Sequence, residues 1–199
     1  MGLTKKRIPA DERKKLIIRS AVEVFSESNY HLAKVPEIAK LADVSEAMVY
    51  KYFKTKKCLF LTTLTRIGQK TIDRLYINNY QGPSNAKENI EYVSWDYLRT
   101  MNNSNKELTI FYQAISEKND ECVKKTLQAI YQSYAKFFQE IIEKGIEKKE
   151  INSQVNAINY SWQLVGHLIH LSTFYLLDLY SEENAQEVIQ QHLQKLDIN

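Results

Sequence analysis

Short amphipathic helical segments, separated by turn residues, constrain what this chain of 199 residues can fold into more than any other feature. The first helix is expected over residues 13–28, because apolar side chains recur there on one helical face, at Ile17, Ala21, Val24 and Phe25. A second helix is expected to begin at Val35, since a proline such as Pro36 is tolerated in a first helical turn. Beyond residue 55 there is no clear strand signal, so the pattern predicts an all-α fold.

A tight turn leads from the second helix into a third. Ser45 is a strong N-cap, and it predicts a helix from Glu46 to about Phe53. Val44 and Val49, together with Phe53, would complete a core shared by the three helices. Short helices that meet at a tight turn, followed by aromatic and basic residues, are typical of a helix-turn-helix DNA-binding unit.

Six further helices are predicted after residue 55, which brings the total to about nine. Their boundaries come from capping residues and from the stop signal Gln81-Gly82-Pro83. They are a long helix over 56–79, a helix capped by Ser84, one opened by the capping box Ser104-Asn105-Lys106-Glu107 and running to about Glu117, a longer one from Asn119-Asp120 to about Lys149, and two begun by Ser153 and Ser181.

Positive charge is concentrated at the N-terminal end of the chain. Residues 1–60 hold 13 basic and 7 acidic residues, which leaves 14 basic and 17 acidic residues for the remainder. A basic head on a nearly neutral body is the charge distribution expected of a protein that binds nucleic acid through one domain.

The chain has no sequence signal for catalysis, a metal or a membrane. Cys58 and Cys122 have no nearby His or Cys at metal-ligand spacing, so they are interpreted as reduced thiols. Glycine-rich phosphate loops, nucleophile elbows and zinc-protease motifs are missing from the sequence. No apolar run approaches a membrane span and no signal core follows Met1. We therefore expect a cytoplasmic protein that is not an enzyme, with no cofactor and no metal.

An ordered set of short motifs at fixed spacing runs through residues 13–61, which resemble the N-terminal domain of the tetracycline-repressor (TetR) family of bacterial transcriptional regulators. The resemblance implies a helix-turn-helix DNA-binding domain at residues 1–54 and a helical effector-binding and dimerisation domain at residues 55–199. The motifs that carry it are Ala21-Val22-Glu23-Val24-Phe25, Asn29-Tyr30, Val35, Ile38-Ala39, Ala42-Asp43-Val44-Ser45, Tyr50-Lys51-Tyr52-Phe53 and Lys56-Lys57-Cys58-Leu59.

The chain departs from the family pattern at several positions. Asn29 and Asp43 stand where the family usually has glycines, and these are the non-glycine types that best tolerate a left-handed backbone. Ala33-Lys34 and Ala47-Met48 replace residues that often contact DNA. The expected geometry is therefore kept, while the identity of individual DNA contacts changes.

The resemblance implies a homodimer that binds a pseudo-palindromic operator, with the third helix of each copy in the major groove and half-sites about 34–36 Å apart. Tyr52 is alternatively a core residue, and Lys51 and Lys56 are alternatively solvated charges. Dimerisation is expected through the last two long helices, whose apolar faces hold Val155, Ile158, Trp162, Val165, Ile169, Ala185, Val188, Ile189, Leu193 and Leu196. The candidate DNA-binding residues are Lys34, Ser45, Glu46, Ala47, Met48, Tyr50, Lys51, Tyr52 and Lys56.

The larger domain is expected to hold a small lipophilic or aromatic effector whose binding shifts the fourth helix and releases the DNA. His167 and His170 are alternatively satisfied core residues, ligand contacts or metal ligands. Few carboxylates fall on the predicted inward faces, which favours a neutral or acidic effector. An all-helical protein-interaction module and an activator on the same fold stay as alternatives. The candidate ligand-binding residues, many of which serve equally well as core, are Trp95, Phe111, Tyr112, Tyr131, Tyr134, Phe138, Trp162, His170 and Phe174.

Overall fold

The computed structural model describes residues 9–101 and 104–197. Within these ranges the chain forms nine α-helices and one short 3-10 helix, and no strand. The prediction of an all-α fold is therefore confirmed.

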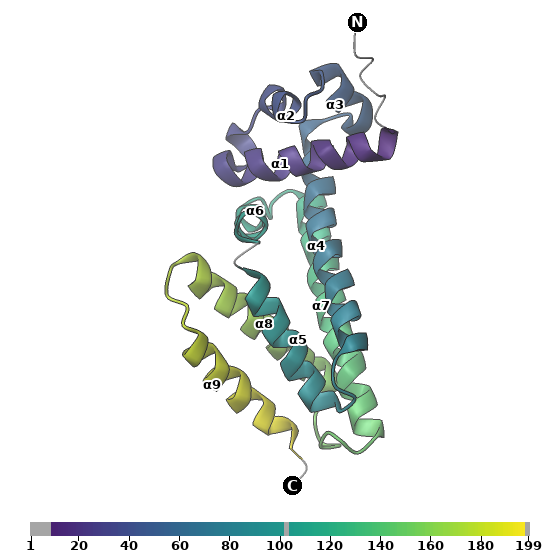
Figure 1. Ribbon diagram of the computed structural model, residues 1–199, viewed down its shortest axis with the longest axis vertical. Coiled ribbons are helices and arrows are strands. Elements are labelled where there is room, and N and C mark those ends of the chain that lie inside the picture. The colour runs from purple at the N-terminus through teal and green to yellow at the C-terminus, as the bar shows by residue number, and fades with distance from the viewer. Residues whose placement is uncertain (1–8, 102–103, 198–199) are drawn as a thin grey trace, which may run out of the picture.

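Three helices form a head that lies across one end of the molecule (Figure 1). They are α1 (Ala10–Leu32), α2 (Val35–Leu41) and α3 (Glu46–Phe53). Phe25 of α1 is fully buried, and its ring meets the ring of Phe60 edge to face at 5.1 Å between centroids. Apolar burial against the chain that follows α3 therefore anchors the head.

The first helix is longer than the predicted span of 13–28, because it begins at Ala10 and because one more turn follows a break at Asn29. Asn29 has φ 57°, and its side-chain oxygen accepts hydrogen bonds from the backbone N–H groups of His31 and Leu32. Asp43 in the turn before α3 has φ 51°. Both residues thus take the left-handed backbone expected of them.

Two long helices form the spine of the molecule. α4 (Lys56–Gln81) and α7 (Glu121–Glu147) lie side by side and run in the same direction away from the head (Figure 1). Gly68 lies at their contact, where an added Cβ would come within 2.7 Å of the Ile130 side chain. This close approach explains a glycine in the middle of an amphipathic helix.

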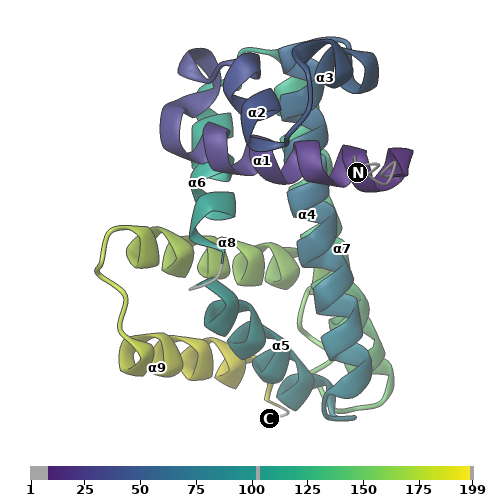
Figure 2. The same cartoon turned by 45° about the horizontal axis from the view of Figure 1, so that its top comes forward.

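The remaining helices pack around the spine. α6 (Asn105–Ser116) lies between the head and the body and packs on α1, while α8 (Ala157–Leu176) packs on α7. Figure 2 shows α5 (Ala86–Thr100), α8 and α9 (Glu182–Leu193) stacked at the end of the body away from the head. The 3-10 turn η2 (Gln194–Leu196) follows α9.

The helix starts predicted at Ser45 and Ser181 are confirmed, and those predicted at Ser84 and Ser153 are wrong. Ser45 and Ser181 cap α3 and α9 through their side chains, and Asp120, one of the two residues expected to precede α7, caps that helix. Asn85 rather than Ser84 caps α5, and Asn156 rather than Ser153 caps α8. In both errors an asparagine that caps at least as well as serine stood one or three residues further along.

The capping box predicted at residues 104–107 does not form. Ser104 precedes α6, but its side chain makes no capping hydrogen bond. Glu107 pairs instead with Lys70 of α4 at 2.8 Å. The Glu107 carboxylate thus pairs with a lysine from a distant part of the chain and not with the backbone at the start of α6, as the local pattern predicted.

The hydrophobic core does not divide at residue 54. One cluster of buried side chains joins the head to the first half of α4, to α6 and to the first turns of α7, and it includes Phe60, Ile110 and Val123. A second cluster, here called the lower core, fills the part of the body farther from the head, which we call the lower body. A movement of α4 or α6 therefore reaches the head through continuous packing.

Candidate DNA-binding surface and effector cavity

The outward face of α3 carries most of the predicted DNA-binding residues. The Ser45 hydroxyl accepts a hydrogen bond from the Met48 backbone N–H at 3.2 Å and fixes the start of the helix. Val49 and Phe53 point into the core, so the opposite face is left to solvent. The exposed residues of this face are Ser45, Glu46, Ala47, Tyr50 and Lys51, with Met48 partly exposed.

The structure separates the two tyrosines of α3. Tyr50 is 44 % exposed, whereas Tyr52 is partly buried against the core of the head, with its ring 6.4 Å from that of Phe53. Lys34 is exposed immediately before α2. Tyr50 and Lys34 are thus free to meet a ligand, and part of the Tyr52 side chain serves as core.

Lys56 occupies a structural position that the resemblance did not imply. Its ammonium donates hydrogen bonds to the backbone oxygens of His31 and Ala33, at 3.1 and 3.2 Å, and lies 4.9 Å from the centre of the Tyr30 ring. Carbonyl groups at a helix C-terminus and an aromatic face both attract a cation. Lys56 therefore holds the end of α1 onto the start of α4.

Charged contacts hold the helices next to the head to one another and to the head itself. Lys57, in the first turn of α4, bonds to Asp120 at the start of α7 at 2.5 Å, and this hydrogen bond holds the pKa of the Asp120 carboxyl below its ordinary value. Lys106 of α6 pairs with Glu23 and Glu27 of α1. The orientation of the head is therefore set by polar contacts as well as by the shared core.

A cavity of ≈ 90 Å³ lies between α4, α5, α6, α7 and α8. Aromatic residues of α6 and α7 form much of its wall. Five of the nine predicted ligand-binding residues line it, namely Phe111, Tyr112, Tyr131, Tyr134 and Phe138.

The other four predicted ligand-binding residues do not line the cavity. Trp162 is 45 % exposed on the outer side of α8, and Trp95 packs against the core of the lower body. His170 is exposed, and its ring meets that of Phe174 at 4.2 Å. Trp162 and His170 thus face solvent and Trp95 packs in the core, which the sequence pattern of one helix could not reveal.

Several lining residues were missed by sequence reasoning. The hydroxyl of Tyr97 lies 3.0 Å from that of Ser172, and burial raises the pKa of this phenol. Burial also raises the pKa of Tyr131 to about 12. Both rings therefore stay neutral at physiological pH and offer hydroxyl groups inside an otherwise apolar wall.

Two ion pairs mark the solvent-facing side of the cavity. Lys70 pairs with Glu107 of α6, and Arg74 pairs with Asp96 of α5 at 2.7 Å. The Lys70 and Arg74 side chains are 60 % and 48 % exposed. Glu107 and Asp96 are the two carboxylates that line the cavity, and each is paired with a cation.

The outer surface of α8 carries apolar residues without cover from the described part of the chain. Ile158 is 54 % exposed and Trp162 is 45 % exposed, and the two residues lie one helical turn apart. A Cβ added at Gly166, one further turn along, would meet no atom within 4 Å. The outer face of α8 therefore presents a strip, defined by Ile158, Trp162 and Gly166, against which a second helix could pack closely.

Half of the ten apolar positions assigned to a dimer interface are instead buried within the chain. Their side chains pack into the lower core, because α9 lies against α5 and α8 follows the spine. The positions that the structure buries in this way are Val165, Ala185, Ile189, Leu193 and Leu196.

His167 and His192 form a stacked pair between α8 and α9, with ring centres 5.5 Å apart. The Nε2 atom of each ring is buried without a hydrogen-bond partner. Burial lowers the pKa of His192 to about 4 and also lowers that of His167. Both rings are therefore neutral parts of the packing at neutral pH.

In the described ranges no three His, Cys, Asp or Glu residues are grouped so that they could hold a metal ion. Both cysteines are free and exposed. None of the helices in the same ranges is both long and apolar enough to span a bilayer.

Comparison with known proteins agrees with this arrangement. The family model for bacterial regulatory proteins of the tetR family matches residues 17–63. The Fatty acid metabolism regulator protein of Bacillus subtilis (strain 168) is 26 % identical over 141 residues, which cover 71 % of this chain and 72 % of that protein. The HTH-type transcriptional activator FasR of Mycolicibacterium smegmatis is 42 % identical over 60 residues, or 30 % of this chain and 27 % of that protein.

Among solved structures, the transcriptional regulator FadR from Bacillus subtilis in complex with stearoyl-CoA has the same fold. The TM-score is 0.78 and the identity is 21 %, over 92 % of this chain and 99 % of that one. The likeness therefore extends from the head through the whole helical body.

Proposed function

This chain belongs to the tetR family of bacterial regulatory proteins, and from that premise we propose that it is a ligand-responsive repressor that binds a pseudo-palindromic operator as a dimer. The observation that carries the proposal is the exposed face of α3, capped at Ser45 and flanked by Tyr50 and Lys51. A short helix of this kind on a basic head fits the major groove.

The effector that we propose is an amphiphile with an apolar chain and an anionic head. The cavity wall is aromatic and aliphatic, and its solvent-facing side holds Lys70 and Arg74. An anionic group would compete with Glu107 and Asp96 for these cations. Since the related FadR was solved with stearoyl-CoA, a long-chain acyl-CoA is our first candidate.

Release of DNA follows from the size of the cavity. At ≈ 90 Å³ it is smaller than the cavity of roughly 150 Å³ that accepts benzene in another protein, so any effector must widen it. Two of its walls, α4 and α6, pack directly on α1. An effector that binds only the widened form therefore shifts the population toward a different placement of the two heads.

The test is a fluorescence-anisotropy titration of the DNA that flanks the protein's own gene, with stearoyl-CoA, free CoA and stearate. We expect tight, sequence-specific binding that long-chain acyl-CoA reverses and CoA does not. Arg74→Ala should raise the acyl-CoA concentration needed for release about tenfold, in line with the loss of one charge-assisted hydrogen bond. Lys87→Ala, outside the cavity, serves as the matched control.

Equal affinity for every DNA sequence at all salt concentrations would contradict a regulatory role. The alternative of a protein-interaction module predicts that Tyr50→Ala leaves partner binding intact and that no DNA affinity exists. Activation on the same fold is favoured by the likeness of the head to the activator FasR. A reporter fused to the flanking promoter decides the sign, since deletion of a repressor raises expression and deletion of an activator lowers it.

A further inference from the structure

Four tyrosines line the effector cavity, and they differ in what their hydroxyl groups contact. Tyr97 belongs to α5 and Tyr112 to α6, while Tyr131 and Tyr134 lie three residues apart on α7. Each phenol has one hydrogen to donate, and a polar group in an apolar wall is normally paired. A phenol that the chain itself does not pair is therefore a candidate for contact with the effector.

Tyr97 and Tyr112 give their hydroxyl hydrogens to α8. The Ser172 hydroxyl donates to the Leu168 backbone oxygen at 2.8 Å, so Tyr97 is the donor in its 3.0 Å contact with Ser172. Tyr112 donates to the Ile169 backbone oxygen at 3.0 Å. These bonds join α5 and α6 to α8, and they leave neither phenol with a hydrogen for a ligand.

Tyr131 differs from the other three tyrosines. Tyr134 donates to the Gly68 backbone oxygen at 3.5 Å, whereas the Tyr131 hydroxyl has no hydrogen-bond partner in the part of the chain that the structure describes. Neighbouring rings hold the Tyr131 ring in place, since its centroid lies 6.2 Å from those of both Phe111 and Tyr134. Its hydroxyl oxygen is not fully enclosed, so a molecule in the cavity can reach it.

The surroundings of the Tyr131 hydroxyl favour an uncharged acceptor. Burial is the main cause that raises its pKa to about 12, and the phenols of Tyr112 and Tyr97 raise it further. No charged side chain within the described ranges contributes to this shift. A charged acceptor placed there would lose its hydration without gaining a cation, while a neutral carbonyl oxygen loses little.

We propose that Tyr131 is a specificity-determining residue of the effector cavity, and that its hydroxyl donates a hydrogen bond to a neutral carbonyl oxygen of the effector. The inference rests on the proposed function, in which the effector is a long-chain acyl-CoA. In such a molecule the thioester carbonyl is the neutral acceptor at the junction of the apolar chain and the polar head. A hydroxyl that gains its partner only when the effector is present adds its full worth to binding.

The experiment is isothermal titration calorimetry of the full-length protein with stearoyl-CoA and with S-octadecyl-CoA, below the concentrations at which they form micelles. The second compound is a thioether that lacks only the carbonyl oxygen. We expect the parent protein to bind the thioether about fivefold more weakly, which corresponds to one neutral hydrogen bond. Tyr131→Phe should bind stearoyl-CoA about fivefold more weakly than the parent does, and should bind the two compounds equally.

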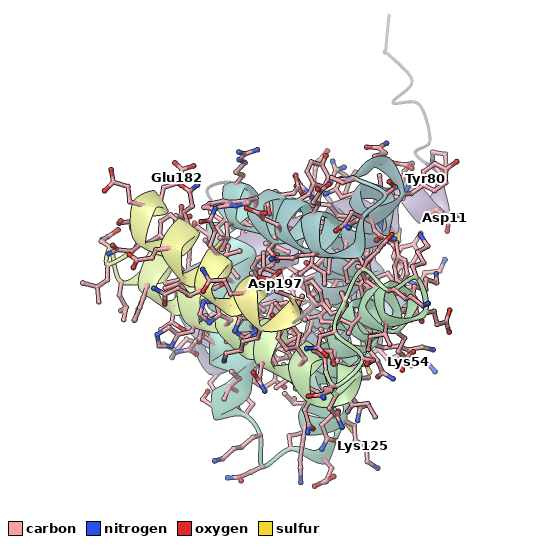
Figure 3. All side chains as sticks on the ribbon, turned by 90° about the horizontal axis from the view of Figure 1, so that it is seen from below. Asp11, Lys54, Tyr80, Lys125, Glu182 and Asp197 are labelled. Carbon is pink, nitrogen blue, oxygen red and sulfur yellow. The ribbon has the colours of Figure 1, made fainter. Side chains whose placement is uncertain are left out.

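Tyr80→Phe is the matched control, because it removes the same hydroxyl group outside the cavity. Tyr80 is 91 % exposed, and Figure 3, viewed from below, shows it at the edge of the molecule. This variant should keep the fivefold preference of the parent protein. The melting temperature of Tyr131→Phe without ligand should not fall, since the substitution breaks no hydrogen bond within the described chain.

Three results would overturn the proposal while leaving an acyl-CoA effector in place. They are equal binding of the two compounds by the parent protein, a preference for stearoyl-CoA that persists in Tyr131→Phe, and a melting temperature that Tyr131→Phe lowers. The persisting preference would mean that another group receives the carbonyl oxygen, and the lower melting temperature would mean that the hydroxyl has a structural partner. If the parent protein binds neither compound, the proposed effector is wrong, and the proposal for Tyr131 is wrong with it.

Discussion

Lys149 has a left-handed backbone, with φ 60°, at the end of α7. Its N–H donates to the Ile146 oxygen at 3.0 Å, and the N–H of Glu150 donates to the Gly145 oxygen at 2.8 Å. This pattern closes a helix most favourably with glycine, which has no Cβ to clash in that conformation. Asn29 and Asp43 solve the same problem in the head with residue types that tolerate positive φ, whereas Lys149 does not.

Lys149→Gly should therefore stabilise the protein by about 1 kcal/mol, through relief of the left-handed strain. Urea denaturation followed by circular dichroism measures the change in the free energy of unfolding. Lys136→Gly, in the exposed middle of the same helix, should destabilise by about 1 kcal/mol. A destabilising effect at both positions would contradict the account of Lys149.

Lys51 and Lys56 differ in what they contact, and their substitutions should separate DNA affinity from stability. Lys51→Ala should weaken operator binding, and the dependence of the binding constant on salt should fall by about one released counterion. Thermal stability should not change, because the Lys51 side chain is exposed on the outer face of α3. Lys56→Ala should lower the free energy of unfolding by about 1 kcal/mol, since two carbonyl oxygens lose their donor. Equal stability of both variants would contradict the structural role of Lys56.

At the scale of helices, the contact between α8 and α9 depends on neutral histidines. The Tyr160 hydroxyl donates to the His192 backbone oxygen at 2.7 Å, and the His192 ring stacks on His167. The unfolded chain binds a proton at His192 near the ordinary pKa of 6.5, while the folded chain does so near 4. Stability is therefore complete above pH 6.5 and is lost progressively as the pH falls from 6.5 toward 4.

His192→Phe keeps an aromatic ring in this stack and removes the titrating group. Its melting temperature should fall less than that of the parent protein between pH 6.5 and pH 4, as measured by differential scanning calorimetry. His170→Gln removes an exposed histidine of α8 that lies outside the stack, and it should keep most of the pH dependence of the parent. Identical slopes for the parent and His192→Phe would mean that His192 is not the group responsible.

Local patterns and distant contacts compete in deciding where helices begin and what their ends contact. Ser45 could be recognised as a cap from the sequence because its partner, the Met48 N–H, lies three residues away. Glu107 could not be assigned correctly, because its partner Lys70 is 37 residues away in the chain. The same distinction applies to Lys56, which bonds to carbonyl oxygens of the preceding helix.

For the whole molecule, the strip of Ile158, Trp162 and Gly166 on α8 is our candidate dimer surface. An apolar strip with a glycine in it permits two helices to approach closely. Trp162→Glu should convert a dimer into a monomer in size-exclusion chromatography with light scattering, and should lower operator affinity at least tenfold, because two half-sites are no longer bound together.

The matched control is Ile77→Glu on α4, which also places a charge at an exposed apolar residue and lies outside this strip. It should stay dimeric. A dimer that survives Trp162→Glu and dissociates with Ile77→Glu would move the interface to the lower end of α4.

The sequence alone was sufficient to predict the all-α class, the three-helix head and the face of α3 that points outward. Each of these depends on interactions within a few residues, namely helical periodicity, capping and turn conformation. It was also sufficient for five aromatic residues of the cavity, because large apolar side chains on amphipathic helices point inward.

Only the tertiary structure decided which inward side chains face an empty space and which fill the core. Trp95 packs into the lower core while Tyr97, two residues away, lines the cavity. The placement of Ala185 and Leu193 inside the chain and the Lys56 contact with α1 were likewise decided by neighbours from distant segments. Helical periodicity gives each side chain a direction relative to its own axis, but the crossing of helices determines what lies in that direction.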